Sequence, residues 1–214
     1  MADSTTADAP ELAYGPTHYD ELEHPPLSTG VSNEKLTMWS FLGSDCLLFG
    51  ALISTYLLLR NRTGPDTHGP TAADLFDIPF TSVSSFVLLM SSLTMVLAVA
   101  AIVEGNLERC KLWLLTTAAL GSIFIAGQVY EFTTFYREGL GYTTNISSSA
   151  FYTLTGFHGV HVSLGIVMLV SLVALIQRGS LTVDRAETVE IIGLYWHFVD
   201  IVWIVIFAVV YLIP

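Results

Sequence analysis

Two histidines, His158 and His161, lie three residues apart inside the apolar segment FYTLTGFHGVHV (151–162). Side chains at this spacing share one face of a helix, so both rings would point the same way. Ionisable side chains at membrane depth are costly and usually mark a functional site. The two rings could bind a haem iron or another metal. Because histidines on one helix face cannot bind opposite faces of a haem, His197 would have to be the second ligand.

Three carboxylates also fall within apolar segments, at Asp45, Glu131 and Asp200. A carboxylate in such a place must be paired, hydrogen-bonded or protonated. Gln128 lies three residues before Glu131 and would face the same way. We expect Asp45, Gln128 and Glu131 to form one polar cluster with His158 and His161, and this cluster could support proton uptake. Structural hydrogen bonds between helices are the alternative interpretation.

The segment EIIGLYWHFVDIVW (190–203) places His197 and Asp200 three residues apart, where they could pair with each other. Trp196 precedes this pair, and Trp39 begins the earlier segment WSFLG. Tryptophan rings are typical of membrane interfaces and of protein contacts. We expect Trp39, Trp196, His197 and Asp200 to contact lipid or a partner subunit.

The sequence contains no phosphate-binding loop, no GxGxxG, no nucleophile elbow and no HExxH. Its two cysteines, Cys46 and Cys110, have no metal-ligand spacing and predict buried thiols. These observations predict that the chain itself has no catalytic residue, no metal and no bound cofactor.

Composition indicates an integral membrane protein. The chain is 52% hydrophobic and only 13% charged, whereas soluble domains carry about 25% charged residues, and its mean hydropathy is +0.61. The net charge of −11 comes largely from residues 1–34, which hold seven acids, four prolines and no lysine or arginine. We expect this segment to be a disordered or draped tail, and its acidity excludes nucleic acid as a partner.

The remaining residues, 35–214, predict an all-α domain with five transmembrane helices. An apolar run of about 20 residues can cross a bilayer as a helix, and continuous runs exclude a closed barrel. The predicted spans are 36–59, 80–103, 112–135, 148–177 and 190–213.

The distribution of lysine and arginine predicts the orientation of the spans. One side of the membrane carries five such residues, Lys35, Arg109, Lys111, Arg178 and Arg185, and the other carries three, Arg60, Arg62 and Arg137. The larger number predicts a cytoplasmic N-terminus and a C-terminus on the outward side.

In four segments the chain resembles subunit III of the haem–copper terminal oxidases. The segments are WSFLGSDCLLFG (39–50), GxxFxxxQxxEF (121–132), FYTLTGFHGVHVSLG (151–165) and YWHFVDIVWIVIFAVVYL (195–212). They occur in the family's order and cover nearly all of residues 36–213. Longer members of the family have seven spans, and this chain resembles the shorter bacterial versions with five.

The resemblance implies a core subunit of an aerobic respiratory oxidase in the bacterial inner (plasma) membrane. In the family, haems and copper belong to subunits I and II, the expected partners. Subunit III packs on subunit I, holds phospholipids in a cleft and supports proton uptake and durable turnover. The family's acid in the first motif is usually glutamate, and Asp45 is one methylene shorter. The other matching residues are Glu131, His158, His161, Trp196, His197 and Asp200.

Several alternatives stay open at this point. Quinol oxidases have closely similar third subunits, and a larger respiratory supercomplex is a further partner to consider. A membrane cytochrome would use His197 with a histidine of 148–177. A small proton-coupled transporter would be built around Asp45 and Glu131, although no inverted repeat is found.

Overall fold

The computed structural model describes residues 32–60 and 76–213, and helices make up most of these two ranges. The long helices are α1 (Asn33–Leu59), α3 (Ile78–Val103), α4 (Leu107–Arg137), α5 (Ile146–Gln177) and α6 (Ala186–Phe207). A 3-10 turn, η1 (Val183–Arg185), precedes α6, and a π-helical segment, η2 (Ala208–Leu212), continues it. In the described ranges, five segments are long and apolar enough to cross a membrane, with α6 and η2 counted as one. The predicted all-α, five-span fold is confirmed.

The helices extend beyond the predicted spans, most clearly at α4. This helix begins at Leu107, whereas the predicted span begins at residue 112. Asn106 explains the early start, because its side chain accepts the backbone N–H of Arg109 at 3.0 Å and caps the helix. Most of the predicted acidic tail, residues 1–31, lies outside the described residues, and Ser32 caps α1.

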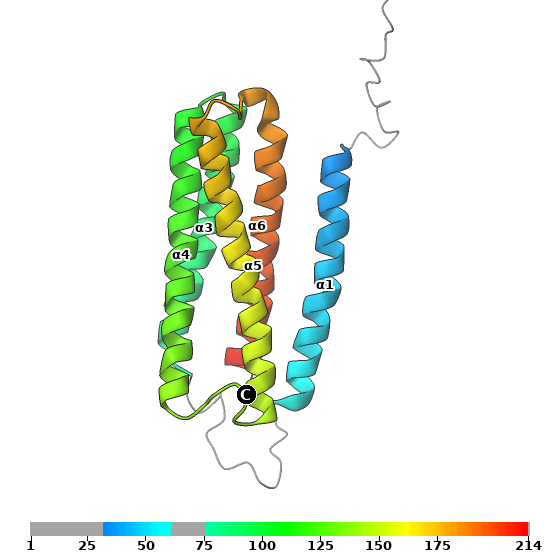
Figure 1. Cartoon of the computed structure of the whole chain (residues 1–214), viewed down its shortest axis with the longest axis vertical. Coiled ribbons are helices and arrows are strands. Elements are labelled where there is room, and N and C mark those ends of the chain that lie inside the picture. The colour runs from blue at the N-terminus through cyan, green and yellow to red at the C-terminus, as the bar shows by residue number, and fades with distance from the viewer. Residues whose placement is uncertain (1–31, 61–75, 214) are drawn as a thin grey trace, which may run out of the picture.

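An odd number of spans puts the start of α1 and the end of η2 at opposite ends of the bundle (Figure 1). Which end faces the cytoplasm stays a prediction from the charges.

Three glycines end three of the helices. Gly105, Gly139 and Gly179 follow α3, α4 and α5 with φ values of 81°, 92° and 69°. Only glycine adopts this region without steric cost, so each is suited to turn the chain after a helix. Each turn reverses the chain, so α4, α5 and α6 each pack antiparallel to the helix that precedes them (Figure 1).

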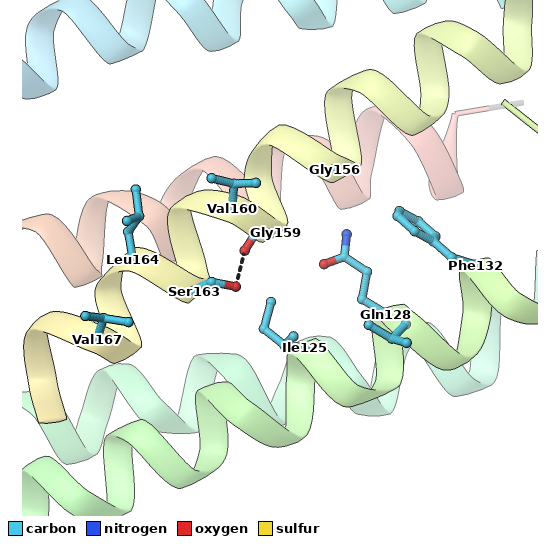
Figure 2. Close-up of a pocket in the computed structure, with 10 residues that line it drawn as sticks. Ile125, Gln128, Phe132, Gly156, Gly159, Val160, Ser163, Leu164 and Val167 are labelled. Atoms are coloured by element: carbon cyan, nitrogen blue, oxygen red, sulfur yellow. Dashed lines mark hydrogen bonds between the residues drawn. The ribbon is translucent and has the colours of Figure 1, made fainter.

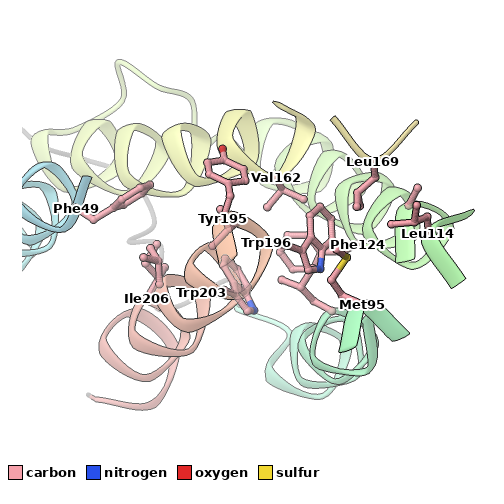
Figure 3. Close-up of a cluster of buried hydrophobic side chains, with 14 of the residues drawn as sticks. Phe49, Met95, Leu114, Phe124, Val162, Leu169, Tyr195, Trp196, Trp203 and Ile206 are labelled. Atoms are coloured by element: carbon pink, nitrogen blue, oxygen red, sulfur yellow. The ribbon is translucent and has the colours of Figure 1, made fainter. Parts of the chain in front are cut away.

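The core centres on Trp196 of α6, which is 1% exposed. Its indole lies between two glycine backbones, Gly121 on α4 and Gly165 on α5. A Cβ at Gly121 would lie 2.6 Å from Cη2 of the ring, and a Cβ at Gly165 would lie 2.8 Å from Cε3 and Cζ3. Figure 3 shows Trp196 and Trp203 among buried side chains from the other helices, including Met95 and Phe124. The two glycines thus allow three helices to close around one indole.

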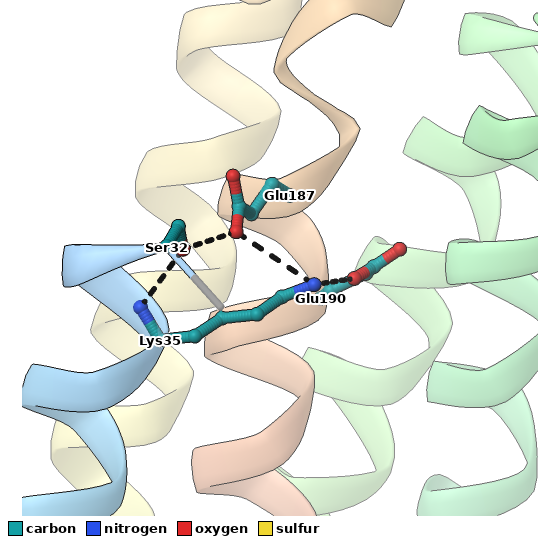
Figure 4. Close-up of polar contacts among 4 residues, drawn as sticks. All are labelled: Ser32, Lys35, Glu187 and Glu190. Carbon is teal, nitrogen blue, oxygen red and sulfur yellow. Dashed lines mark hydrogen bonds and ion pairs between the residues drawn. The ribbon is translucent and has the colours of Figure 1, made fainter. Parts of the chain in front are cut away.

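Helix α1 is the most exposed of the five and stands at one side of the others (Figure 1). It packs mainly on α5 and α6. At its N-terminal end, Lys35 forms ion pairs with Glu190 at 2.8 Å and Glu187 at 3.7 Å, and Ser32 donates a hydrogen bond to Glu187 (Figure 4). At its C-terminal end, the Arg60 side chain donates to the carbonyl oxygen of Ile213 at 3.1 Å. Polar contacts therefore hold both ends of α1.

Candidate functional site: polar groups buried between the helices

Asp45 on α1 and His161 on α5 face each other where these helices pack. Asp45 is 6% exposed, and its Oδ2 lies 3.5 Å from Nε2 of His161. The other ring nitrogen, Nδ1, lies 2.8 Å from the backbone carbonyl oxygen of Phe157. Phe49 meets the imidazole edge-on, with ring centroids 5.0 Å apart. The structure thus brings together two residues of the expected polar cluster.

His158 lies one turn away in a different environment. It is completely buried, and neither ring nitrogen has a hydrogen-bond partner among the described residues. Trp203 stacks on the ring at a centroid distance of 4.9 Å, and Phe124 and Phe49 approach it edge-on. His158 is therefore part of an aromatic core, and the expectation that it joins Asp45 and Glu131 through polar contacts is corrected.

Glu131 forms a separate hydrogen-bonded group. Thr81 on α3 donates to its Oε1 at 3.0 Å, and the phenol of Tyr211 in η2 lies 3.2 Å from both carboxylate oxygens. The expectation that a histidine of α5 partners Glu131 is therefore wrong. No sequence pattern indicates Thr81 or Tyr211 as partners, because they lie 50 and 80 residues away along the chain.

Gln128 lies at a groove between α4 and α5. Its Nε2 donates to the backbone carbonyl of Thr155 at 2.8 Å, and its Oε1 lies against Gly159. Figure 2 shows this amide between the helices, with Ile125 on one side of it and Phe132 on the other. The groove has a volume of about 360 Å³ and is lined mainly by Ile125, Phe132, Gly156, Val160, Leu164 and Val167. Gln128 is thus a helix–helix contact that borders an apolar groove.

His197 and Asp200 do not bond to each other in the described structure, which corrects the expected direct pairing. Both contact Ser92 of α3: its hydroxyl lies 3.0 Å from Nδ1 of His197 and donates to Asp200. Asp200 is 3% exposed.

The two tryptophans grouped with this pair occupy opposite environments. Trp196 is buried, and its Nε1 donates to Ser91 at 3.0 Å, which corrects the expectation of a lipid or partner contact there. Trp39 is 65% exposed. Its contact with lipid or a partner stays a prediction.

Metal-binding groups are not assembled in the described ranges: no three histidine, cysteine, aspartate or glutamate side chains come together there. Each histidine of α5 and α6 has its own packing partners, namely Asp45, the ring of Trp203 and Ser92. The site therefore consists of separate polar groups, each joining two or three helices.

Comparison with known proteins shows to which protein family the chain with these polar groups belongs. Residues 29–213, almost all of the chain beyond the acidic tail, match the family described as Cytochrome c oxidase subunit III. The chain belongs to this family. As a subunit III it is part of a multi-subunit haem–copper terminal oxidase, an oxidoreductase complex, and a multi-pass protein of the bacterial plasma membrane.

Individual relatives of this subunit III include proteins of two named kinds. Cytochrome c oxidase subunit 3 of Bacillus sp. (strain PS3) is 39% identical over 84% of this chain and 86% of its own length. The protein of the same name from Alkalihalophilus pseudofirmus is 38% identical over 88% of this chain and 91% of its own. "Probable quinol oxidase subunit 3" of Staphylococcus saprophyticus is 38% identical over 84% and 88%.

Proposed function

We propose that this subunit III is a non-catalytic part of a proton-pumping oxidase that passes electrons from cytochrome c to oxygen and forms water. Cytochrome c is the proposed donor because two relatives are named cytochrome c oxidase subunits. A quinol is the second candidate, because a relative of almost equal identity is named a quinol oxidase subunit. The purified complex should oxidise reduced cytochrome c and contain copper in its subunit II. Oxidation of a quinol alone would favour the second candidate.

The contact between Asp45 and His161 is the observation that supports a role in proton uptake. Nδ1 of His161 lies against a carbonyl oxygen, which can only accept, so Nδ1 carries a hydrogen. In a neutral ring Nε2 would then be an acceptor, and it faces a carboxylate oxygen that is also an acceptor. The two atoms attract only when one additional proton lies on Nε2 or on the carboxyl group. The pair is therefore a site for one exchangeable proton.

This proton also makes the pair neutral overall, which favours its burial. A single unpaired charge at this position would be expensive, because neither hydrocarbon nor packed side chains solvate it. We propose that the pair stabilises the contact between α1 and α5 and supports proton uptake into the complex. The chemistry on oxygen is proposed to take place in the partner subunits.

Asp45→Ala is expected to shorten the lifetime of the oxidase during turnover more than it lowers the initial rate. It removes the acid of an accessory pair and leaves the reaction centre intact. Initial oxygen consumption and its decay over many turnovers measure the two effects. Ser171→Ala is the control, since Ser171 is exposed on α5, away from α1, and its hydroxyl donates within its own helix to Val167. An intact complex with an initial rate near zero would overturn the accessory role.

The groove between α4 and α5 supports the proposed binding of phospholipid. Its lining is apolar apart from Gln128 and Ser163, and Gly156 and Gly159 keep it open. A Cβ at Gly156 would meet no atom within 4 Å, so the space beside it is free for another molecule. An acyl chain has the width and polarity to lie there.

Gly156→Leu is expected to remove tightly bound phospholipid from the purified complex, because the new side chain occupies the groove. Native mass spectrometry of the detergent-purified oxidase measures the lipid retained. Gly156→Ala fills little of the space and is the control. Equal lipid content in wild type and Gly156→Leu would show that the acyl chain lies elsewhere.

The exposed face of α1 supports the proposed packing on subunit I. Small residues on this face let another helix come close, as they do in membrane helix pairs. They alternate with larger apolar residues, of which Leu47 is 77% exposed. The small residues are Ser40, Gly43, Gly50 and Ser54, all exposed.

We propose that the chain itself holds no haem, and the histidine environments support this. A bis-histidine haem would need His197 together with His158 or His161. His158 is enclosed by three aromatic rings, and both nitrogens of His161 already face other groups. Haem absorbance that stays with the stripped, folded chain would contradict this proposal. The alternative of a proton-coupled transporter is also not supported, because Asp45 and Glu131 have different partners and do not form one site.

A further inference from the structure

The contact of Ser92 with both Asp200 and His197 lies near the middle of the membrane-spanning part of α3 and α6. Asp200 is buried, and its second oxygen, Oδ1, has no hydrogen-bond partner among the described residues. His197 is only partly buried. Its ring lines a groove of about 430 Å³ between α3 and α6, together with Val96, Val99, Ala100, Gly193, Leu194 and Glu190. One end of the cluster is therefore enclosed and the other end borders an open groove.

The hydrogen count of this cluster allows two arrangements. The single hydroxyl hydrogen of Ser92 can be donated to Asp200 or to Nδ1 of His197, but not to both at once. If Asp200 is ionised, it accepts this hydrogen, and Nδ1–H of His197 donates to the Ser92 oxygen. If Asp200 is protonated, it donates to the Ser92 oxygen, and the hydroxyl donates to Nδ1. In the second arrangement the ring hydrogen of His197 lies on Nε2.

We propose that Asp200, Ser92 and His197 form a proton-binding relay, with His197 exchanging protons in the groove and Asp200 storing one in the core. When a proton binds at Nε2, the Nδ1 hydrogen moves to the Ser92 oxygen and the Ser92 hydrogen moves to Asp200 Oδ2. The cluster gains one proton and changes from one negative charge to none. No oxidant or other reactant is needed. The ligand of this site is a proton delivered by water or by a hydroxylated molecule in the groove.

Burial favours the protonated arrangement. An ionised Asp200 would leave Oδ1 without a donor inside the bundle, whereas a neutral acid loses much less on leaving water. Among the residues that the structure describes, Asp200 forms no ion pair with a lysine or arginine. Over Ile78–Val103, α3 has no titratable side chain. The other ionisable groups of the α6 interfaces are Glu187 and Glu190, which pair with Lys35, Tyr195, whose phenol donates to the backbone carbonyl of His161, His158, which stacks on Trp203, and the Asp45–His161 pair.

Infrared spectroscopy of the purified complex tests this relay. The wild type should show the carbonyl band of a protonated carboxylic acid that is absent from Asp200→Asn. After transfer to heavy water this band should shift as the acid exchanges its proton. Ser92→Ala should keep the band but slow its exchange by about 100-fold, the lower end of what a positioned proton-transfer group contributes. Ser171→Ala is the control, since this exposed serine contacts only its own helix.

His197→Gln provides a second variant in case Ser92→Ala weakens assembly, because it removes the exchanging nitrogen and leaves Ser92 in place. Its exchange should be slowed in the same way. A band unchanged in Asp200→Asn would show that Asp200 is ionised and would overturn the proposal. Exchange at the wild-type rate in a folded Ser92→Ala or His197→Gln complex would also overturn it. Asp45 variants should leave this band unchanged, so the test is independent of the role proposed for the Asp45–His161 pair.

Discussion

Trp196→Ala is expected to be the most destabilising single change in the described part of this subunit. Truncation of a buried tryptophan costs roughly 3–5 kcal/mol, because apolar contacts are lost and a cavity remains. Here the cavity would lie where α4, α5 and α6 meet, and Ser91 would lose its indole donor. The midpoint of thermal dissociation of the detergent-purified oxidase measures the effect. A midpoint equal to that of the wild type would show that the indole does not hold these helices together.

Alanine substitutions at two glycines of α5 provide a matched pair of variants that tests the same packing around Trp196. Gly165→Ala places a Cβ 2.8 Å from the indole, whose six-membered ring also lies close to the backbone of Gly121 on α4. Overpacking of this kind costs roughly 1–3 kcal/mol. Gly156→Ala makes the same change on the same helix, where the new Cβ meets nothing within 4 Å. We expect the first to lower the thermal midpoint and the second to leave it unchanged or raise it.

Glu131→Ala is expected to have the second largest effect on stability. Tyr211 would lose its acceptor, at a cost of about 1–3 kcal/mol for a buried hydroxyl left unsatisfied, whereas the Thr81 hydroxyl can still donate to the carbonyl oxygen of Asp77 at 3.0 Å. Glu131→Gln keeps one acceptor oxygen in place and should lose less. The yield of assembled oxidase and its thermal midpoint measure the difference. Full stability of Glu131→Ala would mean that water replaces the carboxylate, and the group would then not be structural.

Tyr211→Phe separates the contribution of the phenol from that of the carboxylate. It removes one donor to Glu131 while the ring keeps its packing on Phe76 and Phe207. Its effect should be smaller than that of Glu131→Ala, because Thr81 still donates to the carboxylate. If Tyr211→Phe lowered the thermal midpoint more than Glu131→Ala, the stabilisation would come from contacts of the Tyr211 ring and not from its hydrogen bond to Glu131.

The number of helices could be predicted from the sequence because lipid offers no hydrogen-bond partners to the backbone. A spanning segment must satisfy its own N–H and C=O groups, and a continuous apolar run therefore becomes a helix. The helix ends were less predictable, since they depend on caps such as Asn106, whose side chain reaches the third residue of α4.

The partners of the buried polar residues were predictable only in part. Asp45 and His161 were expected in one cluster, but spacing along a helix gives only the direction of a side chain. Which neighbour it meets depends on how distant helices rotate and pack. Ser92 shows this limit most clearly, because a serine in an apolar run carries no signal until α6 places Asp200 and His197 beside it. Tyr211 likewise reaches Glu131 from the π-helical segment that follows α6.

The exposure of α1 has a consequence for biosynthesis. The ribosome completes α1 at Leu59, whereas its packing partners α5 and α6 begin only at Ile146 and Ala186. At about 5–20 residues per second, this helix waits in the bilayer for several seconds to tens of seconds before α6 exists. Until α5 is made, Asp45 has no His161 to pair with. We therefore expect newly inserted α1 to be open to chaperones or membrane proteases until the later helices are made, and variants that weaken the Asp45–His161 contact should prolong this period.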